Sequence, residues 1–238
     1  MAKTNSKTFG VGVVLAISFF AVLALIFSPV FGGGMNGLTY ADDLFNKLSK
    51  GSSYFIPKLQ TGAQGFAGRQ FEAAVKLDKP ETAALAVTLF SAAGAAASAD
   101  GVSLTVSGDL GAVLTAALRD SDEMYRNDGA AVSSRYGGVK EKAALKAWHV
   151  SFTAIDKFLK KNGKIEEAKM VSDVMKKAIE TAYNYYGVEA QKVADKALLM
   201  TGLLVFYVIY TMWWGFAIFY MFDGVGLTMT KAKVKKEA

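Results

Sequence analysis

Two long runs without charged residues stand out in the pattern of apolar and polar positions, one near each end of the chain. They cover residues 9–31 and residues 197–222. A helix needs about 20 apolar residues to cross the hydrocarbon core of a bilayer, and both runs reach this length. The sequence therefore predicts transmembrane helix 1 at residues 9–31 and transmembrane helix 2 at residues 197–222.

The first run could instead be a cleaved signal peptide. The apolar part of a signal peptide is shorter, about 7–15 residues, and ends at a cleavage site of the small-x-small type. Here the apolar run is longer, and the segment SPVFGGG that closes it contains no clear Ala-x-Ala motif. An uncleaved membrane anchor is the better interpretation.

The segment before the second run has the pattern of a water-exposed helix. From residue 165 onward, apolar residues recur at steps of three and four, while Lys and Glu lie on the other face. Asp173 lies four residues before Lys177, a spacing that brings opposite charges together on a helix. No proline interrupts residues 164–222 and only Gly187 weakens them, so the pattern predicts one continuous helix over this range.

Most of the region between the two runs also has helical spacing. Residues 138–161 give the clearest helix, because their large apolar side chains recur every three or four positions. This helix and the one predicted to begin at residue 164 are expected to form an antiparallel hairpin. Further helices are expected at residues 36–50, from Pro57, from Pro80 and at residues 109–126.

Residues 82–99 are uncharged and rich in alanine, which leaves two interpretations, a third membrane span and a buried core helix. Alanine contributes little to membrane insertion, whereas Leu, Ile, Phe and Val drive it. The segment contains few of these residues, and a third span would put the two basic ends of the chain on opposite sides of the membrane. We therefore prefer the core helix.

One segment has the alternation of a strand. Val102, Leu104 and Val106 alternate with Ser and Thr, which is typical of a half-buried strand. We identify no second strand in the sequence that could pair with it. Residues 102–106 could pair with a second copy of the chain or with another protein, or could form an extended linker, and these alternatives stay open.

The placement of charge indicates the topology. The chain has a net charge of +6, and lysines flank both apolar runs: Lys3 and Lys7 precede the first, and the segment KAKVKKEA follows the second. Short basic segments stay in the cytoplasm, so residues 1–8 and 223–238 are expected to be cytoplasmic tails. Residues 32–196 are then an extracytoplasmic helical domain. The C-terminal tail is too short, and too poor in aromatic residues, to indicate nucleic-acid binding.

The expected fold class is an all-α membrane protein. Two transmembrane helices flank an extracytoplasmic helical bundle, and the last bundle helix is continuous with the second span. The expected location is the bacterial inner (cytoplasmic) membrane, with the central domain in the periplasm. The expected partners are the lipid bilayer and either other membrane-protein subunits or further copies of this chain.

Few residues suggest chemistry. The chain has no cysteine and one histidine, His149, which excludes disulfides, thiolate metal sites and multi-histidine sites within one chain. Thr153 and Asp156 share a helix face with His149. A haem or metal ligand at His149 is conceivable, but the chain supplies no partner ligands. A histidine at the edge of the core is the better interpretation.

Two other patterns fail as sites. The acidic stretch at residues 120–131 does not fit a calcium-binding EF-hand loop, because Met124 and Tyr125 occupy the positions that need an oxygen ligand and a glycine. Nucleotide-binding, hydrolase and zinc motifs are absent from the sequence. A quinone or lipid contact near Trp213 and Trp214 has only nonspecific support. We predict no catalytic residue, no metal site and no cofactor, and we can name no cofactor-binding residue.

In topology, this arrangement resembles the ligand-binding half of bacterial chemoreceptors, in which two spans flank a periplasmic helical bundle. The resemblance involves no sequence motif. Such receptors also carry a long cytoplasmic signalling region, whereas only residues 223–238 follow the second predicted span. The resemblance therefore implies a ligand-binding domain and not a complete receptor.

Three functional hypotheses follow. The preferred one is a non-catalytic accessory or scaffold subunit of a larger bacterial membrane complex, which acts through helix packing and its extracytoplasmic domain. The alternative is an extracytoplasmic sensor or ligand-binding module that signals through a partner protein. The third is an enzyme or electron carrier with a bound cofactor, and it has the least support because the sequence offers so few reactive groups.

Overall fold

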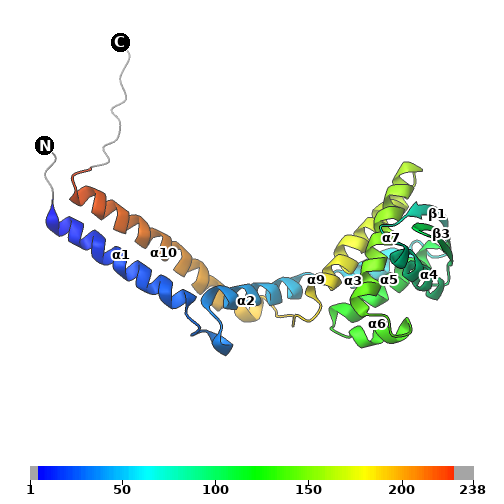
Figure 1. The fold of residues 1–238 in the computed structure, drawn as a ribbon, viewed down its shortest axis with the longest axis horizontal. Helices are drawn as coiled ribbons and strands as arrows, with labels where there is room; N and C mark the ends of the chain where they lie inside the picture. Colours follow the sequence, from blue (N-terminus) through cyan, green and yellow to red (C-terminus); the bar gives the residue numbers. More distant parts are fainter. Residues whose placement is uncertain (1–4, 228–238) are drawn as a thin grey trace, which may run out of the picture. The chain divides into compact units, whose positions relative to one another are not determined.

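The computed structural model describes residues 5–227, which are mostly helical and include one small sheet (Figure 1). The chain divides into two compact units, one made of residues 1–45 and 192–238 and the other of residues 46–191. Lys3 and the C-terminal lysines, on which the predicted topology depends, lie outside the described residues.

The first unit is built on two long apolar helices, α1 (Ser6–Phe27) and α10 (Ala197–Gly224). Both are long and apolar enough to cross a membrane, as the sequence predicted. They run antiparallel, so that the start of α1 lies beside the end of α10. There the backbone N–H of Asn5 donates to the carbonyl of Gly224 at 2.9 Å. The side chain of Asn5 accepts from the N–H groups of Lys7 and Thr8 and so caps α1.

Small residues and two polar aromatic groups hold α1 against α10. A Cβ atom added at Gly12 would lie 2.6 Å from the backbone nitrogen of Met221, so only glycine permits this approach. Trp213 Nε1 donates to the carbonyl of Leu15 at 3.1 Å, and Tyr210 donates its hydroxyl to a second α1 carbonyl. In an apolar medium each of these donors would be costly without a partner, so the contacts fix the pairing of the two helices.

The second unit combines a helical layer with a three-stranded antiparallel sheet. The helix α2 (Gly37–Ser52) leads into this unit from the first. The strands are β1 (Gln70–Lys76), β2 (Ala96–Asp100) and β3 (Ser103–Asp109), in the order β1-β3-β2. The other helices are α3 (Ile56–Gln64), α4 (Pro80–Ala92), α5 (Leu110–Tyr125), α6 (Gly129–Arg135), α7 (Glu141–Lys161), α8 (Ile165–Val174) and α9 (Glu180–Tyr185).

The sheet corrects two predictions. The all-α assignment holds only in part, because the described chain is mostly helical but also contains this sheet. The strand predicted at residues 102–106 has two partners within the chain. It belongs to β3, the central strand, where Leu104 pairs with Val75 on one side and with Ala99 on the other. The side chains of Leu104 and Val106 are buried in the core, in agreement with the alternating pattern of this strand.

The core of the second unit lies between the sheet and the helices. Its centre is an aromatic cluster in which the ring of Trp148 lies 5.0 Å from that of Phe90 and 5.5 Å from that of Phe152. All three side chains are buried. The helix predicted at residues 138–161 is α7, and each of its predicted apolar positions is buried: Leu145, Trp148, Phe152, Ile155 and Leu159.

Residues 82–99 do not form one helix. The helix α4 ends at Ala92, Gly94 takes a left-handed conformation with φ of 83°, and β2 follows. Ala83, Ala86 and Phe90 are buried in the core. The choice of a core element over a third span agrees with the structure, in which α4 is too short to cross a bilayer.

The continuous helix predicted over residues 164–222 is wrong. After α8 the chain makes a π-helical turn (Met175–Ile179), and α9 then ends at Tyr185. Tyr186 is extended and Gly187 has a φ of 89°. A 3-10 turn (Ala194–Lys196) leads into α10. The second candidate span is therefore separated from the last helix of the domain.

Candidate functional site

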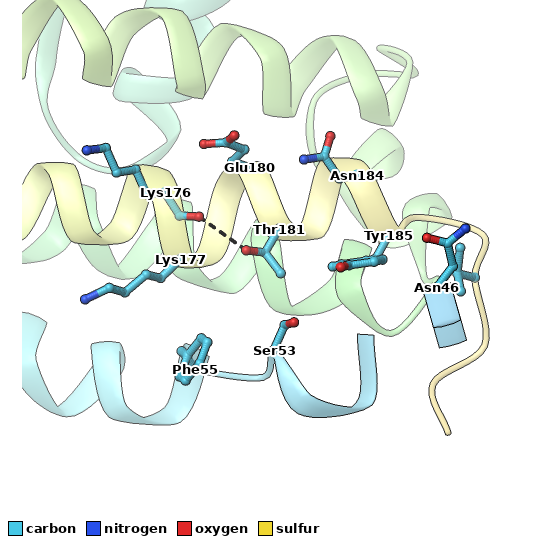
Figure 2. Close-up of a pocket in the computed structure, with 10 residues that line it drawn as sticks. Asn46, Ser53, Phe55, Lys176, Lys177, Glu180, Thr181, Asn184 and Tyr185 are labelled. Atoms are coloured by element: carbon cyan, nitrogen blue, oxygen red, sulfur yellow. Dashed lines mark hydrogen bonds between the residues drawn. The ribbon is translucent and has the colours of Figure 1, made fainter. Parts of the chain in front are cut away.

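A pocket of about 800 Å³ in the second unit lies beside the π-helical turn and α9. Figure 2 shows the end of α2 and the segment after it on one side and α9 on the other. The lining residues combine charged, polar and aromatic side chains: Asn46, Ser53, Phe55, Lys176, Lys177, Glu180, Thr181, Asn184, Tyr185 and Val188.

The π-helical turn sets the direction of the side chains along the pocket. It is closed by a hydrogen bond from the N–H of Glu180 to the carbonyl of Met175, five residues back. The hydroxyl of Thr181 donates to the carbonyl of Lys176 at 3.2 Å, again five residues back. In Figure 2 the side chains of Lys176 and Glu180 lie in one row, while Lys177 and Thr181 lie in a second row nearer to Phe55. Such turns within α-helices are frequent at functional sites.

The charges of the pocket are unequally paired. Lys177 forms an ion pair with Asp173 at 2.8 Å, in agreement with the spacing seen in the sequence. Among the described residues, neither Lys176 nor Glu180 forms an ion pair, and both side chains are exposed. One cation and one anion therefore lie in the same row of the pocket wall, and neither forms an ion pair within residues 5–227.

Beneath the pocket a buried lysine joins the two segments that line it. Lys50, on α2, is 2% exposed. Its Nζ donates to Asn127 Oδ1 at 3.0 Å and to the carbonyls of Tyr185 and Val188 at 3.1 Å and 2.6 Å. These carbonyls lie at the C-terminal end of α9, where the helix dipole favours a cation. Burial lowers the pKa of Lys50.

Asn127 completes this arrangement from the loop between α5 and α6. Its Oδ1 accepts from the N–H of Gly187 at 2.8 Å, and its Nδ2 donates to the carbonyl of Val188 at 3.0 Å. Its φ of 64° is positive, which among the described non-glycine residues occurs only here. A backbone held in this region marks a site where the surroundings impose the conformation.

Tyr125 closes the cluster from α5. Its hydroxyl donates to the carbonyl of Lys50, and its ring lies 5.1 Å from the Lys50 ammonium. Burial raises the pKa of Tyr125 to about 12. We call Lys50, Tyr125, Asn127 and the backbone of residues 185–188 the junction cluster, because it joins the segment that enters the domain to the segment that leaves it.

A second buried polar group has a structural explanation. Asp120 is fully buried, and its carboxylate accepts from Arg135 Nη1 at 2.5 Å, from the Tyr136 hydroxyl at 2.5 Å and from Trp148 Nε1 at 2.8 Å. Burial raises the pKa of Asp120, while these donors oppose the rise. Asp120 therefore anchors the core through these three hydrogen bonds. It begins the acidic stretch at residues 120–131, which does not fit a calcium-binding loop.

The structure does not bring His149, Thr153 and Asp156 together as a site. His149 lies at the wall of a smaller pocket of about 270 Å³ with Tyr183. The Thr153 hydroxyl donates to the backbone carbonyl of His149, and Asp156 pairs with Lys160 at 2.7 Å. Over residues 5–227, no group of three His, Cys, Asp or Glu side chains could hold a metal ion.

The aromatic residues of α10 serve the pairing with α1. The ring of Phe19 lies 4.2 Å from that of Tyr210 and 4.8 Å from that of Trp214. Trp213 lines a mostly apolar pocket of about 420 Å³ within this unit, together with Tyr220. The structure therefore offers a packing role for the Tyr and Trp residues that the sequence singled out.

Sequence reasoning missed the junction cluster. The sequence places Lys50 at the end of the helix expected at residues 36–50, and Asn127 in the acidic stretch at residues 120–131, with no sign that the two residues meet. Their roles depend on residues more than 50 positions away, as in the Lys50–Asn127 and Asn127–Val188 bonds, which no local pattern can indicate. The Asn-Asp-Gly turn at residues 127–129 was the one available signal, since Asn tolerates a left-handed backbone.

Comparison of this chain with models of known protein families, with curated proteins and with solved structures finds no match. The function must therefore be argued from the geometry of the two units themselves.

Proposed function

We propose that the protein is a non-catalytic accessory or scaffold subunit of a larger membrane complex, held in the bilayer by α1 and α10. The observation that carries this proposal is the uncovered apolar surface of the helix pair. Only 6% of the most apolar window of each helix is buried within the chain. Pairing of the two helices thus uses one side of each and leaves the other sides free for lipid or for partner helices.

Small residues on the free sides favour partner helices. A Cβ atom added at Gly10, Gly202 or Gly215 would meet nothing within 4 Å, in contrast to Gly12, which contacts α10. Small residues let helices approach closely in a membrane, where packing rather than the hydrophobic effect drives association. The strand at residues 102–106 no longer supports a partner, because β3 is paired on both sides.

The proposed location is the bacterial inner membrane, with residues 32–196 in the periplasm. The support is the basic character of the two ends of the chain. A cysteine introduced at Lys157 should react with an impermeant thiol reagent in cells whose outer membrane has been permeabilised. A cysteine at Ser6 should react only after the inner membrane is broken. Reaction at Ser6 in intact inner membranes contradicts this topology.

The test of the scaffold proposal is extraction in mild detergent, followed by native mass measurement and identification of the chains that co-purify. The variant Gly10→Leu should reduce partner association while leaving the α1–α10 pair intact, because Gly10 has open space around it. Val11→Leu is the matched control, because Val11 is also exposed but is turned about 100° around the helix from Gly10. A monomer without companions, under conditions that preserve other complexes of that membrane, overturns the proposal.

The second candidate function is a sensor or ligand-binding module that signals through a partner, and the pocket favours it. Its walls come from the segment that enters the domain and from the segment that leaves it towards α10. A molecule bound there would contact both segments at once. A change in these two segments on ligand binding could then reach both candidate spans along the chain.

A further inference from the structure

We propose that the 800 Å³ pocket binds a small zwitterion, a molecule with one carboxylate and one ammonium group such as a free amino acid. This inference rests on the second candidate function, in which the domain is a ligand-binding module. It makes no use of the scaffold proposal, which depends on the helices of the first unit.

Charge complementarity gives the class of ligand. The charge of Lys177 is already neutralised by Asp173, so this pair contributes little to the electrostatic field in the pocket. The groups that remain on the pocket wall are Lys176 and Glu180, one of each sign, four residues apart on the same helix face. A ligand with a single charge would satisfy one of them and be repelled by the other, whereas a zwitterion satisfies both.

The remaining walls suit the rest of such a molecule. Phe55 and Tyr185 supply aromatic surface, and Asn184 supplies an amide that can both donate and accept hydrogen bonds. Ligand pockets have volumes of about 300–1,000 Å³ and combine apolar walls with a few polar groups. A small zwitterion with an aliphatic side chain fits this combination in size and chemistry.

The junction cluster gives binding a structural consequence. Tyr185 and Val188 line the pocket, and their carbonyls are two of the three acceptors that hold Lys50. Asn46 and Ser53, on the other wall, lie four residues before and three residues after Lys50. A ligand that contacts both walls therefore adds to the bonds that hold the two segments together.

Isothermal titration of the full chain in nanodiscs tests the proposal with three matched probes. L-Leucine carries both charges, 4-methylpentanoate lacks the ammonium group, and 3-methylbutylamine lacks the carboxylate. We expect saturable binding of L-leucine with a Kd of about 1 mM or tighter, and at least about tenfold weaker binding of each analogue, the change expected from losing one charge-assisted hydrogen bond.

The variants assign each charge to its partner. Lys176→Gln should weaken L-leucine binding about tenfold and leave 3-methylbutylamine unchanged, because that probe has no carboxylate for Lys176 to bind. Glu180→Gln should also weaken L-leucine binding about tenfold, but should leave 4-methylpentanoate binding unchanged, because that probe has no ammonium group for Glu180 to bind. Lys157→Gln and Glu72→Gln, both exposed and outside the pocket, are the matched controls and should bind as the wild type does.

Three outcomes would overturn the proposal: no saturable binding of L-leucine, equal binding of all three probes, or an equal loss in the control variants. Folding of each variant is checked independently by the near-ultraviolet circular dichroism of the buried Trp148 cluster. None of these outcomes bears on co-purification of partners with the helix pair, so failure of this proposal and failure of the scaffold proposal are distinguishable.

Discussion

The junction cluster predicts that Asn127→Ala is among the most damaging single changes in the second unit, although Asn127 is a loop residue. Its side chain makes three hydrogen bonds, to Lys50 Nζ, to the N–H of Gly187 and to the carbonyl of Val188. A bond to a charged donor contributes about 1.5–3 kcal/mol and a neutral one about 1 kcal/mol. Alanine at a φ of 64° adds roughly 1 kcal/mol of backbone strain.

Asn127 is exposed, so each bond is counted at the low end of its range, and the expected loss is about 3–4 kcal/mol in the free energy of opening the junction. Asn127→Gly should cost about 1 kcal/mol less, since glycine adopts positive φ without strain. Lys50→Met should cost only about 1 kcal/mol, because it removes the buried cation together with its bonds. The acceptors keep other donors: Asn127 Oδ1 retains the N–H of Gly187, and the Tyr185 carbonyl retains that of Val188.

Hydrogen exchange of the full chain in detergent, followed by mass spectrometry, measures these values. Peptides covering residues 46–52 and 185–191 should lose protection in Asn127→Ala, while peptides from the core of α7 should change less. Equal or greater loss in Lys50→Met would refute the reasoning, because it would mean that the ammonium group contributes more to the stability of the junction than the loop amide does.

Three further changes test other parts of the structure. Trp148→Ala should cost about 3–5 kcal/mol in denaturant unfolding, as for other large buried side chains, whereas His149→Ala at the pocket wall should cost less than about 1 kcal/mol; the reverse order would indicate a real site at His149. The pKa of Tyr125 is about 12 in the folded chain and about 10 in the unfolded chain, so the unfolded state loses this proton first as the pH rises. Between about pH 10 and pH 12 the unfolding free energy of the wild type should therefore fall by at most about 2–3 kcal/mol more than that of Tyr125→Phe. Gly12→Val should lower the Tm of the detergent-solubilised protein while Gly10→Val leaves it unchanged, since only the first introduces a clash with α10.

The parts of the fold that sequence predicted are those whose stability is local or dominated by one apolar face. The spans at residues 9–31 and 197–222 correspond to α1 and α10, because length and lack of charge suffice to identify such helices. The helix α7 was also found, since a water-exposed helix must turn its Trp148 side towards the core. The N-cap at Asp109, which accepts from the N–H of Gly111, likewise begins α5 where the sequence placed it.

The errors occurred where contacts distant in sequence decide the structure. Phe71, Ala73 and Val75 are buried on alternate positions of β1, but alanine is a weak strand signal, and β2 is built mostly from alanine. Residues 186–193 contain good helix formers, but the bonds from Lys50 to Val188 and from Gly187 to Asn127 keep this segment from forming a helix. Tertiary contacts override helix propensity, which amounts to less than about 1 kcal/mol per residue.

The junction cluster also determines how mechanical load would pass through the chain. Tension arriving along the backbone from either long helix must enter the second unit at residues 46–52 or 185–191, and these two segments are tied directly by Lys50 and by the bond from the N–H of Gln191 to the carbonyl of Lys47. Load that crosses this short bridge does not have to pass through the sheet or the aromatic centre. Because the bridge consists of a few hydrogen bonds, we expect these bonds to break before the core opens.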